Sequence, residues 1–140
     1  RSFHVTGVQT CALPIFGVVQ YIGAQRSADW LTYCEHMFDF TAIPDEERFG
    51  ILPKGKLMRS PCGQFLWQLI EPEPWMDAED TGECLQRIGL GVKDVGKAVQ
   101  ALKARGVEFV ESSRLHPEDR GALTRSMLGS VAFELVHQDR

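Results

Sequence analysis

Short stretches in which apolar and polar residues alternate recur along the chain, and a period of two is the signature of β-strands. The first such stretch is 18–24, and a second of the same kind is 85–92, each rich in β-formers and glycine. Three further strands are predicted in each half. Their ranges are 40–43, 49–52 and 65–70 in the first half, and 107–110, 122–126 and 130–137 in the second.

A helix is predicted after the first strand of each half, where apolar residues fall three and four positions apart. In the second half Asp94 is the expected N-cap, and Gly106 stands where a left-handed residue ends a helix. In the first half Ser27 or Asp29 is the expected N-cap. The apolar stripes consist of Trp30, Tyr33, Cys34 and Met37 in the first helix and of Val95, Ala98, Val99 and Leu102 in the second.

The two halves repeat each other at a constant offset of 66 residues. Residues 20–23 return as 86–89, residues 54–63 as 120–129, and residues 65–70 as 131–136. One offset shared by several segments indicates a duplicated unit. The sequence therefore predicts an α+β fold of two βαβββ modules, 16–72 and 84–140, joined by an acidic, proline-rich linker, 73–83. We expect the modules to be related by pseudo-twofold symmetry and to form one domain, a cleft-shaped mixed sheet with its helices outside.

Alternation also sorts each predicted strand into two faces, and one face carries a polar residue at four equivalent positions. These positions are Tyr21, Gln68, Arg87 and Glu134. Their neighbours on that face are small, namely Gly23, Gly89, Gly91 and Ala132. Trp67 and Phe133 fall on the opposite face, where core packing is expected. If the modules pair about a twofold axis, the four polar side chains converge in a hollow, the usual setting of a small-molecule site. The alternative is a purely structural ion pair between Arg87 and Glu134, with the other two side chains as hydrogen-bonding neighbours.

Composition narrows the range of partners. The chain has 140 residues, about the size of one domain, with 24% charged residues and a formal net charge of -4. This acidic balance argues against a nucleic-acid partner, and no apolar run is long enough to cross a membrane. The cysteines, Cys11, Cys34, Cys62 and Cys84, lack the close spacing of a zinc site or a disulfide framework, so a cytoplasmic location is expected. Exposed sheet edges would permit a homodimer.

The first residues differ in character from the rest. The segment Val5–Ile15 resembles the in-frame translation of a sequencing-library adapter. We therefore expect residues 1–15 to be a non-native leader, disordered or packed adventitiously. An ordinary N-terminal strand is the alternative, whereas Pro14 and the weakly charged start argue against a signal peptide.

Residues 16–140 resemble the vicinal-oxygen-chelate superfamily of glyoxalases and extradiol dioxygenases, and are nearest to 4-hydroxyphenylpyruvate dioxygenases. The stretch 86–95 (QRIGLGVKDV) resembles the strand and helix start that open a module of that fold. The stretch 128–136 (LGSVAFELV) resembles the closing strand that carries the dioxygenase's glutamate ligand, and residues 30–40 resemble its first helix and turn.

The resemblance implies a divalent metal, Fe(II) in the dioxygenase branch, held by two histidines and one glutamate at the inner positions. Glu134 stands at the glutamate position, but Tyr21 and Arg87 stand where the histidines would be. An arginine has no free lone pair for a metal. We therefore expect the iron site to be absent, with Glu134, the weak ligand Gln68 and the loop residue His116 as the ligands of any metal that does bind.

Three functions are compatible with these residues. The first is a dioxygenase-like or glyoxalase-like enzyme that uses Glu134, Gln68 and His116 on a small oxo acid. The second, which we favour, is a metal-free binding module in which Arg87 holds the carboxylate of a small oxo acid or aromatic ligand. The third is a structural half of a longer protein that has two such module pairs.

Overall fold

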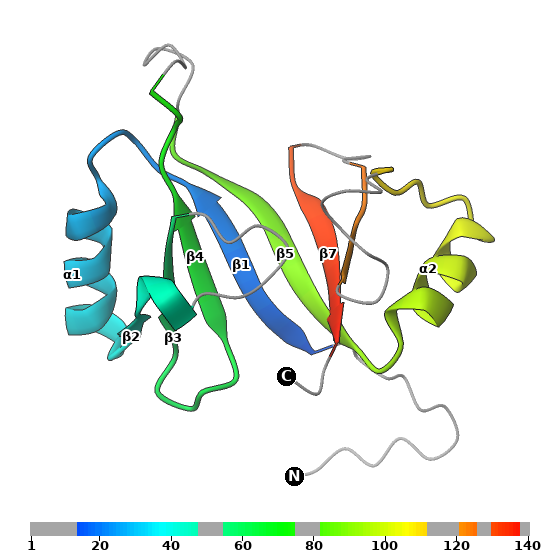
Figure 1. The fold of residues 1–140 in the computed structure, drawn as a ribbon, viewed down its shortest axis with the longest axis horizontal. Helices are drawn as coiled ribbons and strands as arrows, with labels where there is room; N and C mark the ends of the chain where they lie inside the picture. The colour runs from blue at the N-terminus through cyan, green and yellow to red at the C-terminus, as the bar shows by residue number, and fades with distance from the viewer. Residues whose placement is uncertain (1–13, 48–54, 75–81, 112–120, 126–129, 138–140) are drawn as a thin grey trace, which may run out of the picture.

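A computed structural model describes residues 14–47, 55–74, 82–111, 121–125 and 130–137, and Figure 1 shows its sheet crossing the molecule between two helices. In chain order the elements are β1 (Ile15–Tyr21), α1 (Ser27–Phe38), β2 (Thr41–Ile43), the short 3-10 helix η1 (Asp45–Glu47), β3 (Lys56–Arg59), β4 (Leu66–Ile70), β5 (Cys84–Val92), α2 (Val95–Lys103), β6 (Gly121–Leu123) and β7 (Ala132–His137).

The strands form one mixed sheet in the order β2-β3-β4-β1-β5-β7-β6. At its centre β1 and β5 pair antiparallel, and each has a parallel partner on its other side, β4 beside β1 and β7 beside β5. A hairpin completes each half, β3 with β4 and β6 with β7. In the second half Phe109 forms an isolated β-bridge with Thr124, next to β6. In the first half the corresponding place next to β3 is taken by strand β2. The predicted α+β architecture is therefore confirmed.

Strand β3 is the element that the alternation pattern missed. Its residues Leu57 and Met58 are adjacent, and both are buried. Leu57 packs with an apolar cluster on one face of the sheet, whereas Met58 packs against α1 on the other. A strand covered on both faces shows no alternation of apolar and polar residues. Of the strands that were predicted, 49–52 lies outside the described residues.

The first strand begins earlier than expected. Ile15 pairs with Leu90, and the carbonyl of Pro14 accepts a hydrogen bond from the Gly91 N–H at 2.9 Å. Disorder is therefore wrong for Pro14 and Ile15, whose backbone groups pair with this end of β5, while the assignment of residues 1–15 to a non-native leader stays a prediction. Residues 1–13 lie outside the described part of the chain.

Each helix packs against one end of the sheet's outer face. In α2, Val95 and Val99 are buried in a cluster with residues of β5, β6 and β7, as its stripe predicts. In α1, Cys34 is fully buried against β3 and β4, but Tyr33 and Met37 are 48% and 61% exposed, so the predicted stripe is wrong for these two. The helix instead turns Leu31 toward the sheet. Among the described residues, no helix is long and apolar enough to span a membrane.

The two helices begin in different ways. Asp94 caps α2 as predicted, since its carboxylate accepts from the Lys97 N–H at 2.9 Å. Gly106 has the expected left-handed φ of 88°, but it is not the C-cap of the helix, which is Ala104, two residues earlier. In α1 the N-cap is Arg26, whose side chain makes no capping bond. Neither of the caps predicted for α1, Ser27 or Asp29, is its N-cap.

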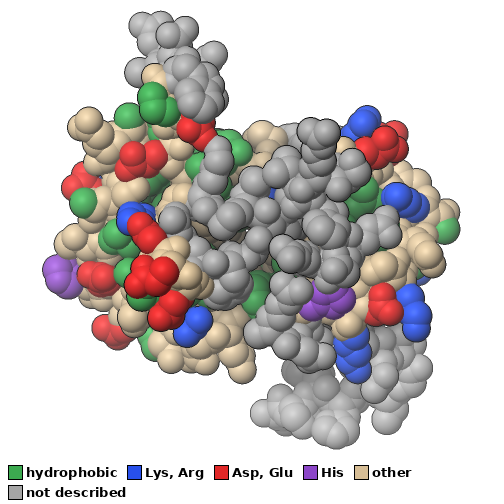
Figure 2. All heavy atoms as spheres, in the orientation of Figure 1, with side chains coloured by type: hydrophobic (Ala, Val, Ile, Leu, Met, Phe, Trp, Pro, Cys, Tyr) green, Lys and Arg blue, Asp and Glu red, His purple; other side chains and the backbone are tan. Residues whose placement is uncertain are grey.

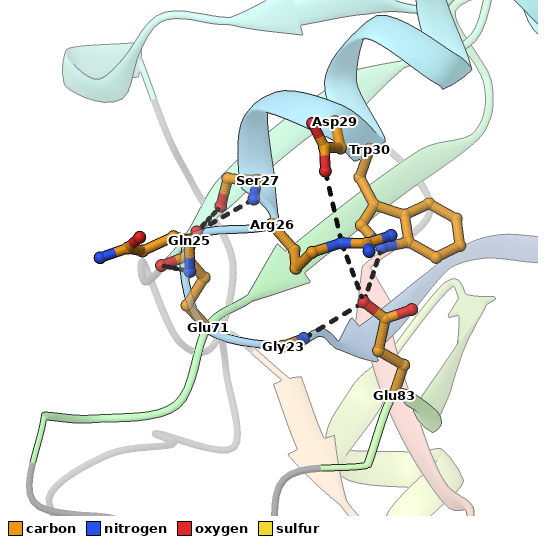
Figure 3. Close-up of polar contacts among 8 residues, drawn as sticks. All are labelled: Gly23, Gln25, Arg26, Ser27, Asp29, Trp30, Glu71 and Glu83. Carbon is orange, nitrogen blue, oxygen red and sulfur yellow. Dashed lines mark hydrogen bonds and ion pairs between the residues drawn. The ribbon is translucent and has the colours of Figure 1, made fainter. Parts of the chain in front are cut away.

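A carboxylate distant in sequence caps α1 instead (Figure 3). Glu71, just beyond β4, accepts from the Ser27 N–H at 3.0 Å, from the Gln25 N–H at 3.2 Å and from the Ser27 hydroxyl. The hydrogen bond from the Ser27 side chain is the largest cause that lowers the pKa of Glu71 below its ordinary value. The charge also suits the positive end of the helix dipole.

Glu83 holds the same turn from the other end of the expected linker. Its carboxylate accepts from the Gly23 N–H at 3.3 Å and from the Trp30 indole N–H at 3.2 Å, and lies 3.6 Å from Arg26 Nε (Figure 3). The bond from the Trp30 side chain is the main cause that lowers the pKa of Glu83. Glu71, shortly before the expected linker, and Glu83, at its end, thus both bind the turn that precedes α1.

Acidic side chains gather on the side of the molecule that carries η1 (Figure 2). All residues of η1, Asp45, Glu46 and Glu47, are acidic and exposed. The ammonium group of Lys56 in β3 lies 2.9 and 3.0 Å from the carboxylate oxygens of Asp45. This exposed contact ties η1 to the sheet, although surface pairs of this kind contribute little stability.

The constant offset of the repeat holds for the hairpins but not for the first strands. Strands β3 and β4 pair in the same register as β6 and β7, with Gln68 and Glu134 at equivalent positions. Because Gln68 pairs with Val19 of β1, the offset would place Glu134 opposite Leu85 of β5. It lies opposite Gly89 instead, a displacement of four residues.

Gly17 allows β1 to approach β4 closely. A Cβ atom at this position would overlap the carbonyl oxygen of Leu66 and stand 3.2 Å from the Leu66 Cβ. We expect Gly17→Ala to lower the free energy of unfolding by about 1 to 3 kcal/mol, the usual cost of overpacking. Urea denaturation checks this, with Gly82→Ala as the control, since no described atom lies within 4 Å of a Cβ there. Equal losses in the two variants would contradict the role given to Gly17.

The lowered pKa of Glu71 predicts a pH-dependent contribution to stability. A depressed folded-state pKa stabilises the protein above the unfolded-state value, and this contribution is lost as pH falls through the folded-state value. Glu71→Gln is therefore expected to cost about 1 kcal/mol at neutral pH, the typical cost of a lost cap. The difference should disappear in acid. Unfolding curves across this range test it, with exposed Glu46→Gln as the control; a penalty that persists in acid would argue against the charge as its cause.

Candidate functional site

Arg87 is the residue around which the candidate site is built. It lies within β5, in register with Val19 of β1 and Ala132 of β7. The residue is 1% exposed, although its guanidinium stays charged at any pH a protein meets. Burial of a charge is costly unless the charge is paired, so the neighbours of Arg87 decide what the site can do.

Glu134 of β7 is the partner that the structure gives to Arg87. It pairs with Gly89, two residues along β5, so the two charged side chains are diagonal neighbours on one face of the sheet. Arg87 Nε and Glu134 Oε2 are 3.8 Å apart, and the side chain of Glu134 is 11% exposed. The structure thus brings together two of the residues that the sequence singled out.

The contact is an ion pair without a hydrogen bond. A separation of 3.8 Å exceeds the donor–acceptor distance of an N–H···O bond. Both Nε and Nη1 of Arg87 are buried and have no hydrogen-bond partner. Each such unsatisfied donor costs about 1 to 3 kcal/mol. A bound anion that accepted from either donor would remove that donor's share of the penalty.

Glycines occupy the positions beside the ion pair on two neighbouring strands, β1 and β5. Gly89 lies opposite Gly17 of β1, and both residues are buried. For a Cβ built at Gly89, the three nearest heavy atoms of the described residues are backbone atoms of Gly17, at 3.4 to 3.9 Å. No described side-chain atom is closer to that position than these backbone atoms. Ala132, opposite Arg87, is also small.

Gln68 lies on the same face, but β1 separates it from Arg87. Gln68 of β4 and Arg87 of β5 both pair with Val19, which stands between them. Gln68 is half-buried and has contacts of its own. Tyr21 lies one side-chain step farther along β1, pairs with Cys84 and is 40% exposed. The register places Val19, and not Tyr21, in the row that joins the two polar residues.

Val19 was missed because an apolar residue in a strand carries no sign of a site. The equivalence of Tyr21 and Arg87 rests on the constant offset, which the pairing of β1 with β4 does not keep. Register between distant strands depends on packing across the whole sheet. No local signal in the sequence would have located Val19 between Gln68 and Arg87.

An apolar cluster lies on the same face of the sheet, at the end of this row that is farthest from Arg87. It consists of Ile43, Leu57 and Leu66, with Phe16 packed against it. Leu57 pairs with Gln68, so the cluster begins one strand away from that amide. Phe16 lies where the pairing of β1 with β5 shifts register, and such an irregularity re-aims a side chain.

The opposite face contains the two aromatic residues expected in the core. Trp67 packs against the cluster beneath α1 and donates its indole N–H to Gln20 Oε1 at 3.1 Å. Phe133 is 43% exposed and belongs to neither of the clusters that the helices form with the sheet. The expectation of core packing is therefore wrong for Phe133, because alternation assigns a face but not the element that covers it.

The residues considered as metal ligands are not gathered in one described group. His116 lies outside the described residues. Within the described ranges, no three side chains of His, Cys, Asp or Glu form a group that could hold a metal ion. Glu134 of β7 is in contact with Arg87, and Gln68 belongs to β4, three places away from β7 in the sheet.

The ion pair should respond asymmetrically to substitution. Glu134→Leu leaves a buried guanidinium without its partner, so we expect a loss of about 3 to 5 kcal/mol in the free energy of unfolding. Adding Arg87→Met should recover part of this loss, because no buried charge remains. Denaturant unfolding of both variants tests the expectation. Substituting Arg125 and Glu108, an exposed pair 3.5 Å apart, in the same way is the control with little effect; additive losses at the buried pair would contradict the assignment.

No family model matches this sequence, and no curated protein is significantly similar to it. Solved structures are similar in fold. A mutant of 4-hydroxymandelate synthase from Streptomyces coelicolor matches with a TM-score of 0.70 and 17% identity, over 91% of this chain and 48% of that one. A xylose isomerase-like TIM barrel/4-hydroxyphenylpyruvate dioxygenase fusion protein matches with a TM-score of 0.65 and 18% identity, over 88% of this chain and 26% of that one.

A similar structure of nearly the same length is methylmalonyl-CoA epimerase from Mycobacterium tuberculosis, with a TM-score of 0.67 and 16% identity over 96% of this chain and 95% of that one. The chain thus spans about half of the synthase and a quarter of the fusion protein. All three neighbours belong to the vicinal-oxygen-chelate superfamily. At these identities the similarity establishes the fold and leaves activity aside. The chain therefore has the vicinal-oxygen-chelate fold.

Proposed function

We propose that this chain is a metal-free small-molecule-binding domain in which Arg87 holds the carboxylate of a small oxo acid or aromatic ligand. One observation carries the proposal: a fully buried guanidinium has two N–H donors without a hydrogen-bond partner. A carboxylate oxygen suits either donor, because a hydrogen bond between two charged groups is among the strong ones. The apolar cluster around Leu57 would accommodate the rest of the ligand.

The residues at the four inner positions do not fit a facial triad for iron. That site needs two imidazoles and a carboxylate on one side of the metal. Here Arg87 has no lone pair to offer, and Tyr21 would have to lose its proton first. Glu134 is the one strong ligand among the four, and within the described ranges it forms an ion pair with the cation of Arg87. The metal site of the fold is, in this proposal, replaced by an ion pair.

The second candidate is a metal-dependent dioxygenase or a glyoxalase-like lyase. Glu134 favours it, because this carboxylate lies on the closing strand of a module in a fold that the synthase and the epimerase share. The chain spans only part of the two dioxygenase-type neighbours, so a structural half of a longer protein is the third reading. A cytoplasmic location and a homodimer are further parts of the proposal.

Calorimetric titration with benzoate, pyruvate and phenylpyruvate tests the binding function. We expect at least one of these carboxylates to bind, and Arg87→Met to weaken its binding about ten- to hundredfold, because a hydrogen bond to a charged group contributes about 1.5 to 3 kcal/mol. Arg125→Met, which removes an exposed arginine, is the matched control with unchanged affinity. Circular dichroism establishes that each variant is folded.

Elemental analysis separates the two main candidates. After incubation with Fe(II) and desalting, we expect no stoichiometric metal in the wild-type protein. Stoichiometric iron, or carboxylate binding that is unchanged in Arg87→Met, would overturn the proposal. Iron that depends on Glu134 would establish the metalloenzyme instead.

A further inference from the structure

We infer that the site selects a zwitterion, a free α-amino acid, over the 2-oxo acid or 2-hydroxy acid with the same side chain. This inference rests on the proposed function, because it assumes that Arg87 takes a carboxylate. It adds a role for Glu134 and names the ligand class by its charges.

The charges of Arg87 and Glu134 cancel each other within the buried site. Arg87 and Glu134 form a pair of opposite charges that are 1% and 11% exposed in their side chains. A carboxylate ligand without a cation adds one uncompensated negative charge to this pair, and burial penalises such a charge. An α-amino acid carries both charges, so the charges of Arg87, Glu134 and the ligand sum to zero.

The spacing of the two charged groups suits a ligand that carries both charges on one carbon atom. Arg87 Nε and Glu134 Oε2 are 3.8 Å apart, close enough to face two substituents of a single ligand carbon atom. The Nε donor of Arg87, which has no hydrogen-bond partner, can bind one oxygen of the carboxylate. A carboxylate has several lone pairs, so Glu134 can accept from an ammonium group while it keeps its existing contacts.

Small residues around the pair are consistent with a ligand at this place. The nearest described atoms to a Cβ at Gly89 belong to the backbone of Gly17, at 3.4 Å and beyond, which is ordinary contact distance. Gly89→Ala should therefore be tolerated by the fold. The added methyl group would stand next to Arg87 and Glu134, where the backbone atoms of a bound amino acid would lie.

Two matched ligand series test the selectivity on the wild-type protein. The first is alanine, lactate and pyruvate, and the second is phenylalanine, phenyllactate and phenylpyruvate. In whichever series binds, we expect the amino acid to bind at least about tenfold more tightly than the oxo acid, the effect of one charge-assisted hydrogen bond. N-acetylphenylalanine lacks the ammonium charge and phenylalanine methyl ester lacks the carboxylate, so each should bind at least about tenfold more weakly than phenylalanine.

Protein variants assign the effect to the residues. Glu134→Gln should remove the preference for the amino acid and leave the affinity for the oxo acid unchanged or higher. Glu108→Gln, at an exposed ion pair, is the control that keeps the preference. Gly89→Ala should weaken binding of the whole series while the unfolding midpoint stays close to that of the wild type. If Glu134→Gln does not fold, the ligand comparisons on the wild-type protein still decide the question.

The outcomes separate this inference from the proposed function. Oxo acids that bind as tightly as amino acids, with a dependence on Arg87, would overturn the inference and leave the proposed function standing. Failure of every carboxylate to bind would overturn both. An amino-acid preference that disappears in Glu134→Gln would establish both.

Discussion

The antiparallel pairing of β1 with β5 is the interaction on which the rest of the structure depends. It is the one place in the sheet order where strands of the two halves meet, and every other strand is attached to one of these two, directly or through a neighbour. Gly17 and Gly89 face each other across this pair, and Gly17 also lets β4 approach without a clash. The pairing places Val19 opposite Arg87, so the joint between the halves and the centre of the candidate site are the same piece of backbone.

A buried ion pair in that position is poor evidence for stability and better evidence for a site. Two apolar residues of similar volume would fill the space without desolvating a charge, and such replacements are often neutral or stabilising. The pair between Arg87 and Glu134 is moreover too long for a hydrogen bond, and it leaves donors of the guanidinium unused. A protein that tolerates this cost in its sheet gains a fixed cation and a fixed anion side by side, which is the arrangement that recognition of a small charged molecule requires.

The start of α1 shows how the rest of the first half is held in place. Its turn has a non-glycine residue, Gln25, at a positive φ of 62°, and the turn's N–H groups are bound by Glu71 and Glu83. These carboxylates come from the end of β4 and from the residue before β5, so the contacts fix the helix relative to the central strands. Tyr33 also makes edge-to-face ring contacts with Trp30 and Phe38 along this helix.

The sequence by itself determined both helices, the described strands other than β3, the two-module plan, the N-cap of α2, and the sharing of one sheet face by Arg87 and Glu134. These follow from local rules, because side chains alternate along any strand and capping needs only neighbouring residues. Only the tertiary structure decided that Val19 stands between Gln68 and Arg87, that Glu71 caps α1, that β3 is a strand and that Phe133 is exposed. Each of these depends on how segments distant in sequence pair and pack against one another. Strand register, and the burial of a given strand face, cannot be read from neighbouring residues alone.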